Sequence, residues 1–269
     1  MTQPFDLDKI RDYWTNQAKT HGQAAAASWS DTRMIDLEIG QLIQFINDGD
    51  RILDVGCANG YTTFQLAHNR KVSIKGLDYI PEMIANAKAR LANLAGELWG
   101  EVSFEEGDIT NLSAPDGAYD KLICVRVLIN LQNQERQIHA VRQCARVVKE
   151  GGLLLLSEAT IQGWQRLNCF RREWGLPDIP MPPFNHYLDL EIFKQDFGCG
   201  LRLERVIDFA STYYVATRVF KPLLAMAAPK EVNIADPGME WNRWAAMLPA
   251  GGDYGVQKLL VFRKTRGST

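Results

Sequence analysis

The central part of the chain alternates between two patterns of hydrophobic and polar residues. Short, almost fully apolar runs are typical of strands buried on both faces, and between them apolar residues recur every three or four positions, as on one face of a helix. Strands that alternate with helices in this way predict parallel βαβ units in a doubly wound α/β sheet. The predicted strands lie at 51–55, 72–77, 102–105, 121–125 and 153–157.

The pattern extends on both sides of this block. Residues 7–20 and 32–46 each place apolar residues on one helical face, and we expect residues 1–47 to form an N-terminal helical cap. The helix before the fifth strand is predicted to end at Gly151-Gly152. Towards the C-terminus we expect a helix at 190–197 behind Asp189, a strand at 201–209 and a last strand at 256–262.

Two stretches break the alternation. Residues 160–188 combine aromatic side chains, arginines and prolines, and a linker seldom carries so many aromatic residues. We expect this stretch to be an inserted lid and residues 211–250 to be its second segment. The main domain then comprises residues 48–159 and 189–269, with the second lid segment inserted in it.

Composition and charge exclude several classes of protein. With 269 residues, of which 46% are hydrophobic and 23% charged, the chain suits one domain with a full core. A net charge of −2 argues against binding to nucleic acid or a membrane surface, and no apolar run has the length of a membrane span. The five cysteines form no CxxC pair, so we expect free thiols in the cytoplasm, and no spacing typical of metal ligands occurs. The oligomeric state stays open, with a homodimer as one option.

The segment Asp54–Gly60 gives the most specific indication of a ligand-binding site. It follows the first predicted strand, where ligands of parallel α/β sheets bind, and its glycines allow a tight turn close to a ligand. A dinucleotide-binding G-x-G-x-x-G motif counted from Gly56 would need glycines at the positions of Ala58 and Tyr61, so that match fails twice.

Three acidic residues follow three successive predicted strands. Asp78 at the end of the second strand is placed to accept hydrogen bonds from ribose hydroxyls, and Asp108 could accept from an adenine amino group while Ile109 packs on the ring. The negative charge of Asp54 would be repelled by a pyrophosphate but attracted by a cation. The set therefore favours S-adenosylmethionine, which carries a sulfonium and an ammonium and no phosphate, although each acid alone is as often only a helix cap.

At these residues the chain resembles the class I S-adenosylmethionine-dependent methyltransferases. The family's D-x-G-x-G-x-G turn, its acid after strand two, its G-D after strand three, the Tyr119-Asp120 pair and the glycine pair before strand five occur in order over residues 50–158, with Ala58 replacing one glycine. The resemblance implies a Rossmann-like seven-stranded sheet with an antiparallel last strand. It also implies S-adenosylmethionine as cofactor, S-adenosylhomocysteine as product, and cofactor contacts from Asp54, Gly56, Cys57, Ala58, Asn59, Gly60, Asp78, Tyr79, Met83, Asp108, Ile109 and Val125.

The sequence gives less information about the methyl acceptor than about the cofactor. His186 in the first lid is our candidate general base, and Asn130 after strand four could orient a substrate. Arg126 could pair with a carboxylate or phosphate of the acceptor, or could instead form a surface salt bridge at the edge of the sheet. The two lid segments more loosely resemble a bacterial subgroup that modifies sugars, polysaccharides or small metabolites. Aromatic, amide and guanidinium groups there suit a polyhydroxylated or anionic acceptor, although some must only pack the lid. The candidate substrate-binding residues are Trp164, Asn168, Asn185, Tyr187, Tyr213, Tyr214 and Arg218.

Three functions remain open at this point. The first is methylation of a hydroxyl on a sugar-like or secondary metabolite. The second is methylation of nitrogen or carbon on a small metabolite, which needs no strong base. The third is a non-catalytic protein that binds an adenosyl cofactor or a nucleotide.

Overall fold

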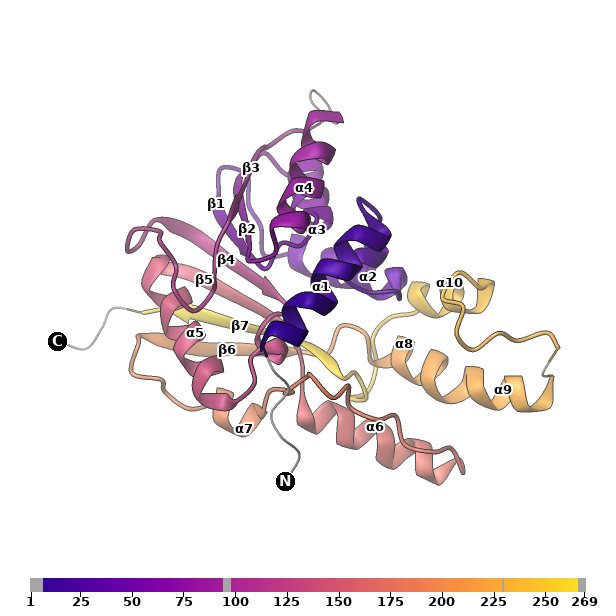
Figure 1. Ribbon diagram of the computed structural model, residues 1–269. Coiled ribbons are helices and arrows are strands. Elements are labelled where there is room, and N and C mark those ends of the chain that lie inside the picture. The colour runs from indigo at the N-terminus through magenta and orange to yellow at the C-terminus, as the bar shows by residue number, and fades with distance from the viewer. Residues whose placement is uncertain (1–6, 94–97, 229, 266–269) are drawn as a thin grey trace.

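The computed structural model describes residues 7–93, 98–228 and 230–265 of the chain, and one sheet runs through its centre (Figure 1). The strands follow the order β3-β2-β1-β4-β5-β7-β6 across that sheet. They are β1 (Arg51–Val55), β2 (Ser73–Asp78), β3 (Glu101–Glu106), β4 (Tyr119–Val125), β5 (Val148–Ala159), β6 (Leu201–Ile207) and β7 (Gln257–Lys264).

The order of the strands confirms the predicted topology. β1 pairs in parallel with both β2 and β4, so the chain winds outwards in both directions from β1. β7 lies between β5 and β6 and is antiparallel to both. The sheet is therefore doubly wound with an antiparallel last strand, and the carboxyl ends of β1, β2 and β4 meet at one edge.

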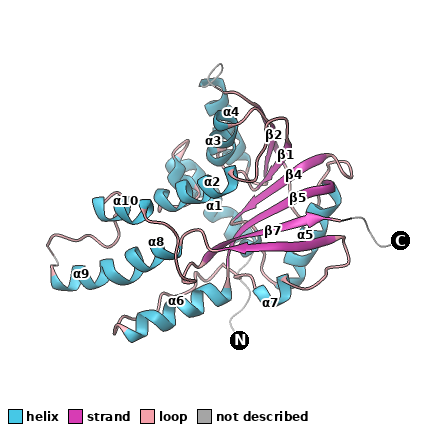
Figure 2. Ribbon diagram, turned by 180° about the vertical axis from the view of Figure 1, so that it is seen from behind, coloured by secondary structure: helices cyan, strands magenta, loops and turns pink. Residues whose placement is uncertain are grey.

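Helices cover both faces of the sheet (Figures 1 and 2). Consecutive strand residues point to opposite faces, so Ile52 joins the core cluster beneath α2 and α3, while Leu53 joins the cluster beneath α5 and α7. The helical segments are α1 (Leu7–His21), η1 (Ala25–Ala27), α2 (Thr32–Ile43), α3 (Tyr61–Asn69), α4 (Pro81–Asn93), η2 (Leu128–Asn130), α5 (Gln134–Val147), α6 (Ile161–Glu173), α7 (Leu190–Phe193), α8 (Ser211–Val215), η3 (Ala216–Phe220), α9 (Lys221–Ala227) and α10 (Glu240–Met247).

One predicted boundary is wrong. The helix before the fifth strand ends at Val147, and Gly151-Gly152 lie within β5 instead of capping that helix. The strand begins early because Val148 already pairs with Tyr119. Glycine is needed at 152 because a Cβ there would lie 2.5 Å from the carbonyl oxygen of Asp120 on the neighbouring strand. The predicted helix behind Asp189 is present but spans only Leu190–Phe193.

The aromatic-rich stretches are helical and are attached to the core. The first begins with α6, whose N-terminus is capped by Thr160, and the second forms α8, η3, α9 and α10. These helices gather on the side of the sheet away from α5 (Figures 1 and 2). Leu167 and Tyr213 are buried in the same cluster as the sheet residues, so the segments extend the core of that face. The part of the predicted N-terminal cap before Leu7 lies outside the described residues.

Candidate functional site

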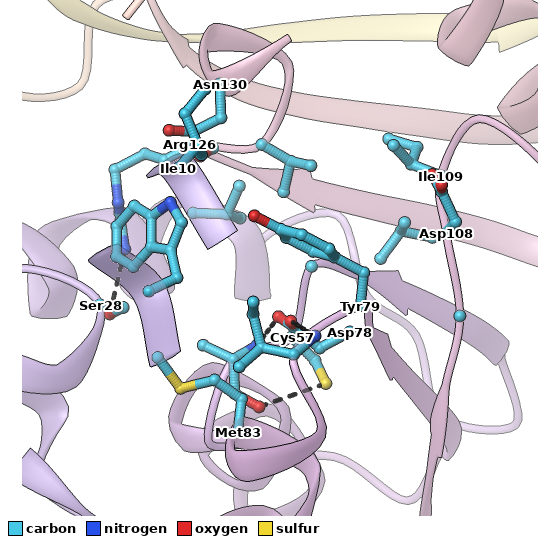
Figure 3. A pocket seen from close by; sticks show the side chains of 18 of the residues that line it. Ile10, Ser28, Cys57, Asp78, Tyr79, Met83, Asp108, Ile109, Arg126 and Asn130 are labelled. Atoms are coloured by element: carbon cyan, nitrogen blue, oxygen red, sulfur yellow. Dashed lines mark hydrogen bonds between the residues drawn. The ribbon is translucent and has the colours of Figure 1, made fainter. Parts of the chain in front are cut away.

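A cavity of about 300 Å³ opens at the carboxyl ends of β1, β2 and β4 (Figure 3). Its floor is the turn after β1, and its walls are the ends of β2 and β4, the segment after β3, and α1. All three acids singled out from the sequence line it, as do all but one of the residues predicted to contact a cofactor. The exception is Gly60.

The turn after β1 takes a shape that few side chains allow. Gly56 has φ +73°, and a Cβ there would lie 2.1 Å from the side chain of Val127, so the turn after β4 can approach closely only because residue 56 is glycine. Ala58 also has a positive φ, +48°, in the left-handed region that alanine rarely adopts. Gly60, at φ +74°, precedes the first residue of α3 and acts through the backbone shape rather than by lining the cavity.

Asp54 and Asp78 are almost completely buried beneath the cavity. Asp54 accepts a hydrogen bond from Thr63 Oγ1 at 2.5 Å, while Asp78 accepts from the backbone N–H groups of Ala58 at 2.8 Å and Ile80 at 2.9 Å. Burial raises the pKa of each carboxyl to about 6, against the lowering effect of these hydrogen bonds. Each carboxylate oxygen has more than one lone pair, so both groups keep capacity for further donors.

The far side of the cavity is more open and partly apolar. Asp108 and Ile109 lie across the cavity from Arg126 and Ser28, with the ring of Tyr79 between the two sides (Figure 3). Asp108 Oδ1 accepts from both the N–H and the hydroxyl of Thr110, at 2.7 and 2.8 Å, while Ile109 is buried. This end offers a carboxylate beside a flat apolar surface.

The N-terminal segment supplies a wall that sequence reasoning missed. Ile10 and Trp14 of α1 line the cavity, as does Ser28 after η1. The loop between these helices is fastened to the floor by Asn59, whose Nδ2 donates to the carbonyl oxygens of Gly22 and Ala24, each at 2.8 Å. The apolar face of residues 7–20 was visible in the sequence, but nothing in its spacing showed which surface it covers.

Arg126 lies at the cavity, but its guanidinium is already engaged. It forms an ion pair with the buried carboxylate of Glu38 on α2 and lies 5.1 Å from the ring centre of Trp29. It also donates a hydrogen bond to Ser28 at 3.4 Å (Figure 3). Glu38 also accepts hydrogen bonds from Ser157 and Gln257. Arg126 thus has a salt bridge within the protein, which joins α2 to the turn after β4, and its pairing with an anionic group of the acceptor stays a prediction.

A second buried acid, Glu158 at the end of β5, shapes the same turn. It accepts from the backbone N–H groups of Val127 at 2.9 Å and Leu128 at 2.8 Å. Burial raises the pKa of Glu158 to about 8, against the opposing effect of these N–H groups. The sequence places Glu158 one residue beyond a predicted strand, but only the fold shows that it caps η2.

Asn130 at the end of η2 carries an unused acceptor. Its Nδ2 donates to the carbonyl oxygen of Arg126 at 2.8 Å, which fixes the amide, while its Oδ1 is buried without a partner among the described residues. A buried acceptor left unpaired costs on the order of 1–3 kcal/mol. Because Asn130 lines the cavity, a donor on a bound molecule would relieve that cost.

The structure does not bring the side chain of His186 to the cavity. Its backbone is held against the turn after β4, since its N–H donates to Ile129 at 2.7 Å and its carbonyl accepts from Gln137 at 2.7 Å. Within the described ranges, none of the residues that line the cavity is a histidine.

The predicted substrate-binding residues also lie elsewhere. Trp164 and Asn168 hold the backbone of Ile179, and the hydroxyl of Tyr213 donates to Asp31 at 2.8 Å. Arg218 forms an ion pair with Asp31 at 2.6 Å. Their neighbours Asn185, Tyr187 and Tyr214 are likewise buried or half-buried away from the cavity. Most of these side chains join the helical segments to each other. Packing therefore accounts for most of the aromatic residues in these two stretches.

The described residues contain neither a cluster of metal-binding side chains nor a membrane-spanning helix. Over residues 7–93, 98–228 and 230–265, no group of three or more histidine, cysteine, aspartate or glutamate side chains is arranged to hold a metal ion. In the same part of the chain, no helix is long and apolar enough to cross a membrane.

Comparison with known proteins points to one family. Residues 46–174 match a family model described as a methyltransferase domain. The chain is 30% identical over 146 residues to 27-O-demethylrifamycin SV methyltransferase of Amycolatopsis mediterranei (strain S699), which covers 54% of this chain and 49% of that protein. It is 32% identical over 105 residues to ajmaline N-methyltransferase of Rauvolfia serpentina, covering 39% of this chain and 34% of that protein. The chain thus spans half or less of the length of these relatives.

A solved structure agrees in fold along nearly the whole chain. Magnesium protoporphyrin IX methyltransferase from Synechocystis PCC 6803, solved with bound S-adenosylhomocysteine, superposes with a TM-score of 0.60 at 17% identity. The superposition covers 97% of this chain and 100% of that one.

Proposed function

We propose that this chain, which belongs to the class I S-adenosylmethionine-dependent methyltransferases, transfers a methyl group from S-adenosylmethionine to a small-molecule acceptor. The observation that carries the proposal is the cavity itself, in which Asp54, Asp78 and Asp108 face one space. The small-molecule class is supported by relatives that are named as methyltransferases of rifamycin and ajmaline compounds.

The residues of the cavity fit an adenosyl-sulfonium cation. Asp54 and Asp78 are two buried carboxyls whose pKa values are raised by burial, so a cation beside them stabilises their charged forms. The guanidinium of Arg126 is paired with the carboxylate of Glu38 and therefore does not oppose that charge. Asp108 and Ile109 together offer an acceptor and an apolar surface, which suits an adenine ring.

When bound, S-adenosylmethionine would supply a methyl group on a sulfonium: a lone pair of the acceptor would bond to the methyl carbon in line as the carbon–sulfur bond breaks, and its electron pair would stay on the sulfur of S-adenosylhomocysteine. This chain has to position that acceptor and exclude water, an effect worth up to about 7–11 kcal/mol in well-oriented reactions. Ile10 and Trp14 cover the cavity from α1. Asn130 Oδ1, a buried acceptor without a partner among the described residues, can accept a hydrogen bond from the acceptor's O–H or N–H.

A hydroxyl of a sugar-like or secondary metabolite is our first candidate acceptor, because the predicted subgroup and the rifamycin relative both point to oxygen. An amine is the second candidate. It is favoured by the absence of a histidine from the cavity lining within the described residues, because a neutral amine needs no general base. Asn130 Oδ1 can accept from either group.

Binding of S-adenosylhomocysteine, measured by calorimetry, tests the cofactor part of the proposal. We expect one molecule bound per chain, and Asp78→Asn to weaken binding about 10- to 100-fold, because it removes a charge-assisted hydrogen bond. Asp116→Asn is the matched control, since Asp116 is an exposed acid paired with Arg146 outside the cavity. Failure to bind at millimolar concentration would remove the basis of the proposal.

A screen of hydroxylated and aminated metabolites with methyl-labelled cofactor tests the acceptor part. With an acceptor in hand, we expect Asn130→Ala to raise KM and His186→Ala to leave turnover within a few-fold of the parent. A large loss of turnover in His186→Ala, with unchanged cofactor binding, would restore this histidine as the base.

A further inference from the structure

A second cavity, of about 500 Å³, lies on the other side of the segment that walls the first. Ser28 faces the first cavity, whereas the next residues, Trp29, Ser30 and Asp31, line the second. Its other walls come from the end of α6 and the residues after it, from η3 and α9, and from α10 and the loop that precedes it. Figures 1 and 2 show these helices gathered beyond the same edge of the sheet, where α6 follows the carboxyl end of β5 and α8 follows that of β6.

Most of the wall is apolar. Leu176, Pro177 and Ile179 line one side, and Pro222, Met226 and Ile234 line the other. A volume of this size lies in the range of small-molecule sites, which are also mainly apolar with a few polar groups.

The polar groups of this cavity carry an excess of positive charge. Arg218 is paired with Asp31, but the buried Arg171 has only carbonyl partners, those of Pro177 at 2.9 Å and of Arg218. Desolvation lowers the pKa of Arg171, as expected for a cation whose burial is poorly compensated.

A second cation nearby also forms no ion pair within the part of the chain that the structure describes. The buried Lys221, whose partner Asn242 lines the cavity, donates to Asn242 Oδ1 at 2.6 Å and to the carbonyl oxygen of Asp236 at 2.7 Å. The carboxylate of Asp236 accepts instead from the N–H of Gly238, and Asp178 is paired with Arg172. The carboxylates of Asp178 and Asp236 act on Arg171 and Lys221 but compensate their burial only in part, since desolvation still lowers both pKa values; an anion in the cavity would offset the remaining cost.

The local backbone is unusual at the same place. η3, which carries Thr217 and Arg218 into the cavity, is a π-helical turn, and such turns are rare and frequent at functional sites. Arg218 is held rigidly there, with its guanidinium 5.1 Å from the ring centre of Tyr214 and 5.6 Å from that of Tyr213. The cationic end of the cavity is thus preorganised.

We propose that this second cavity is a binding site for an amphipathic organic anion, with its apolar body against Leu176 and Met226 and its negative group towards Arg171 and Arg218. The site is separate from the methyl-transfer cavity but shares a residue with its wall, because Trp29 lines the second cavity while its ring packs on Arg126 of the first.

Binding of 8-anilinonaphthalene-1-sulfonate, followed by its fluorescence, tests this site without any assay of methyl transfer. Met226 is 71% exposed at the rim, so its charge can be varied without disturbing the core. We expect Met226→Glu to weaken binding and Met226→Lys to strengthen it, each about two- to fivefold, as for one charge a few ångströms from an anion near the surface. Binding of N-phenyl-1-naphthylamine, which has the same rings without the sulfonate, is expected to be unchanged by either substitution.

Two further variants separate the alternatives. Arg171→Met is expected to weaken the anionic probe by tenfold or more, with circular dichroism and the melting curve reporting whether the variant is folded. Arg11→Glu changes the charge at the lining of the first cavity and serves as the control, with little effect expected. If binding of the anionic probe changed in Arg11→Glu but not in the two Met226 variants, the probe would bind in the first cavity and the proposal would be overturned. The proposal would also be overturned if the substitutions changed binding of the anionic and the neutral probe equally.

Discussion

Single residues at the base of the cavity are held in states that cost free energy. Ala58 and Arg126 are the described non-glycine residues with positive φ, at +48° and +55°, and they belong to the two turns that meet under the cavity. Asp54, Asp78 and Glu158 are buried carboxyls whose pKa values are raised. Strain and buried charge of this kind persist where surrounding structure enforces them, and they are common at functional sites.

Replacing Ala58 by glycine is expected to leave the protein equally stable or to stabilise it by up to about 1 kcal/mol. Glycine adopts the left-handed conformation freely, and this gain outweighs or balances its greater entropy in the unfolded chain. The measurement is urea denaturation of the purified variant. Ala85→Gly, at an exposed position inside α4, is the control and should lose about 1 kcal/mol. Equal losses in both variants would mean that Ala58 is not strained.

The pH dependence of stability should identify Glu158. Its pKa is raised in the folded protein, so its contribution to stability is present below its ordinary value near 4.5 and is lost as pH rises through about 8. The contributions of Asp54 and Asp78 to stability are lost at lower pH, because their pKa values are about 6. Between pH 6.5 and 8.5 we therefore expect the free energy of unfolding to fall by at most about 1.4 kcal/mol per pH unit through Glu158.

Denaturation of Glu158→Gln over the same pH range checks this assignment. The amide does not titrate, so the curve of free energy against pH should be flatter than in the parent. Parallel curves for parent and variant would assign the titration to another group.

Between elements, the important contacts join the N-terminal helices to the sheet. Asn59 fastens the loop after α1 to the turn after β1, and the Glu38–Arg126 ion pair fastens α2 to the turn after β4. Both contacts come from residues that are distant in sequence, and both lie directly at the cavity. They position α1 so that Ile10 and Trp14 face the space above Asp54 and Asp78.

Substitution of Asn59 by alanine is expected to loosen α1 and its loop from the cavity. Two hydrogen bonds to backbone carbonyls are lost in a buried setting, so we expect a loss of about 1–3 kcal/mol in stability. The dissociation constant of S-adenosylhomocysteine should rise about tenfold, because the loop no longer holds the cavity wall. Asn69→Ala removes a similar hydrogen bond, to Gln65 at 2.7 Å, from an exposed helix end. That control should change neither property by more than a small amount.

The whole molecule consists of a doubly wound sheet with two groups of added helices, and each group lines a different cavity. The N-terminal helices cover the carboxyl edge of the sheet, where the first cavity lies. The helices α6 and α8–α10 extend one face of the core and surround the second cavity. A ligand of the first cavity should therefore affect the N-terminal layer more than α10.

Hydrogen exchange with and without S-adenosylhomocysteine checks that difference. At about a hundred times its dissociation constant, the ligand should raise the free energy of unfolding by about 2.7 kcal/mol. Beyond this global effect, we expect slower local exchange in residues 7–27 and in the turn at 126–130, and little change in the exposed helix α10. Protection concentrated in α10 instead would contradict the placement of the ligand under α1.

Much of the fold was predictable because local rules and the global fold agree. Arg51–Val55 is an apolar run between polar segments, and the strand has the bounds that the run predicts. Asp31, Asn133 and Asp189 each accept a hydrogen bond from the first turn of the helix that follows, as their side chains favour. The error at Gly151-Gly152 arose because glycine ends helices more often than it allows two strands to approach closely.

The acceptor side was less predictable because it depends on long-range partners. The sequence could not decide between a substrate contact and a salt bridge for Arg126, because Glu38, which neutralises it, is 88 residues away in the chain. The aromatic and amide residues of 160–220 look alike whether they bind a ligand or each other. Nothing in their spacing distinguishes Trp164, which holds the backbone of Ile179, from a side chain that faces a substrate.

The amino-acid sequence by itself determined the sheet, the turn Asp54–Gly60 and the three acids that follow successive strands, because each of these depends on residues close together in the chain and on the rule that parallel strands end at one edge. Only the tertiary structure decided what faces each cavity. In the folded protein α1 lies over the acids, and Arg126 is paired with Glu38. Asn130 Oδ1 has no partner among the described residues, and Arg218 lines a second, positively charged cavity. The physical reason is that a side chain's role depends on which distant group satisfies its charge and hydrogen bonds, and that partner is known only once the chain has folded.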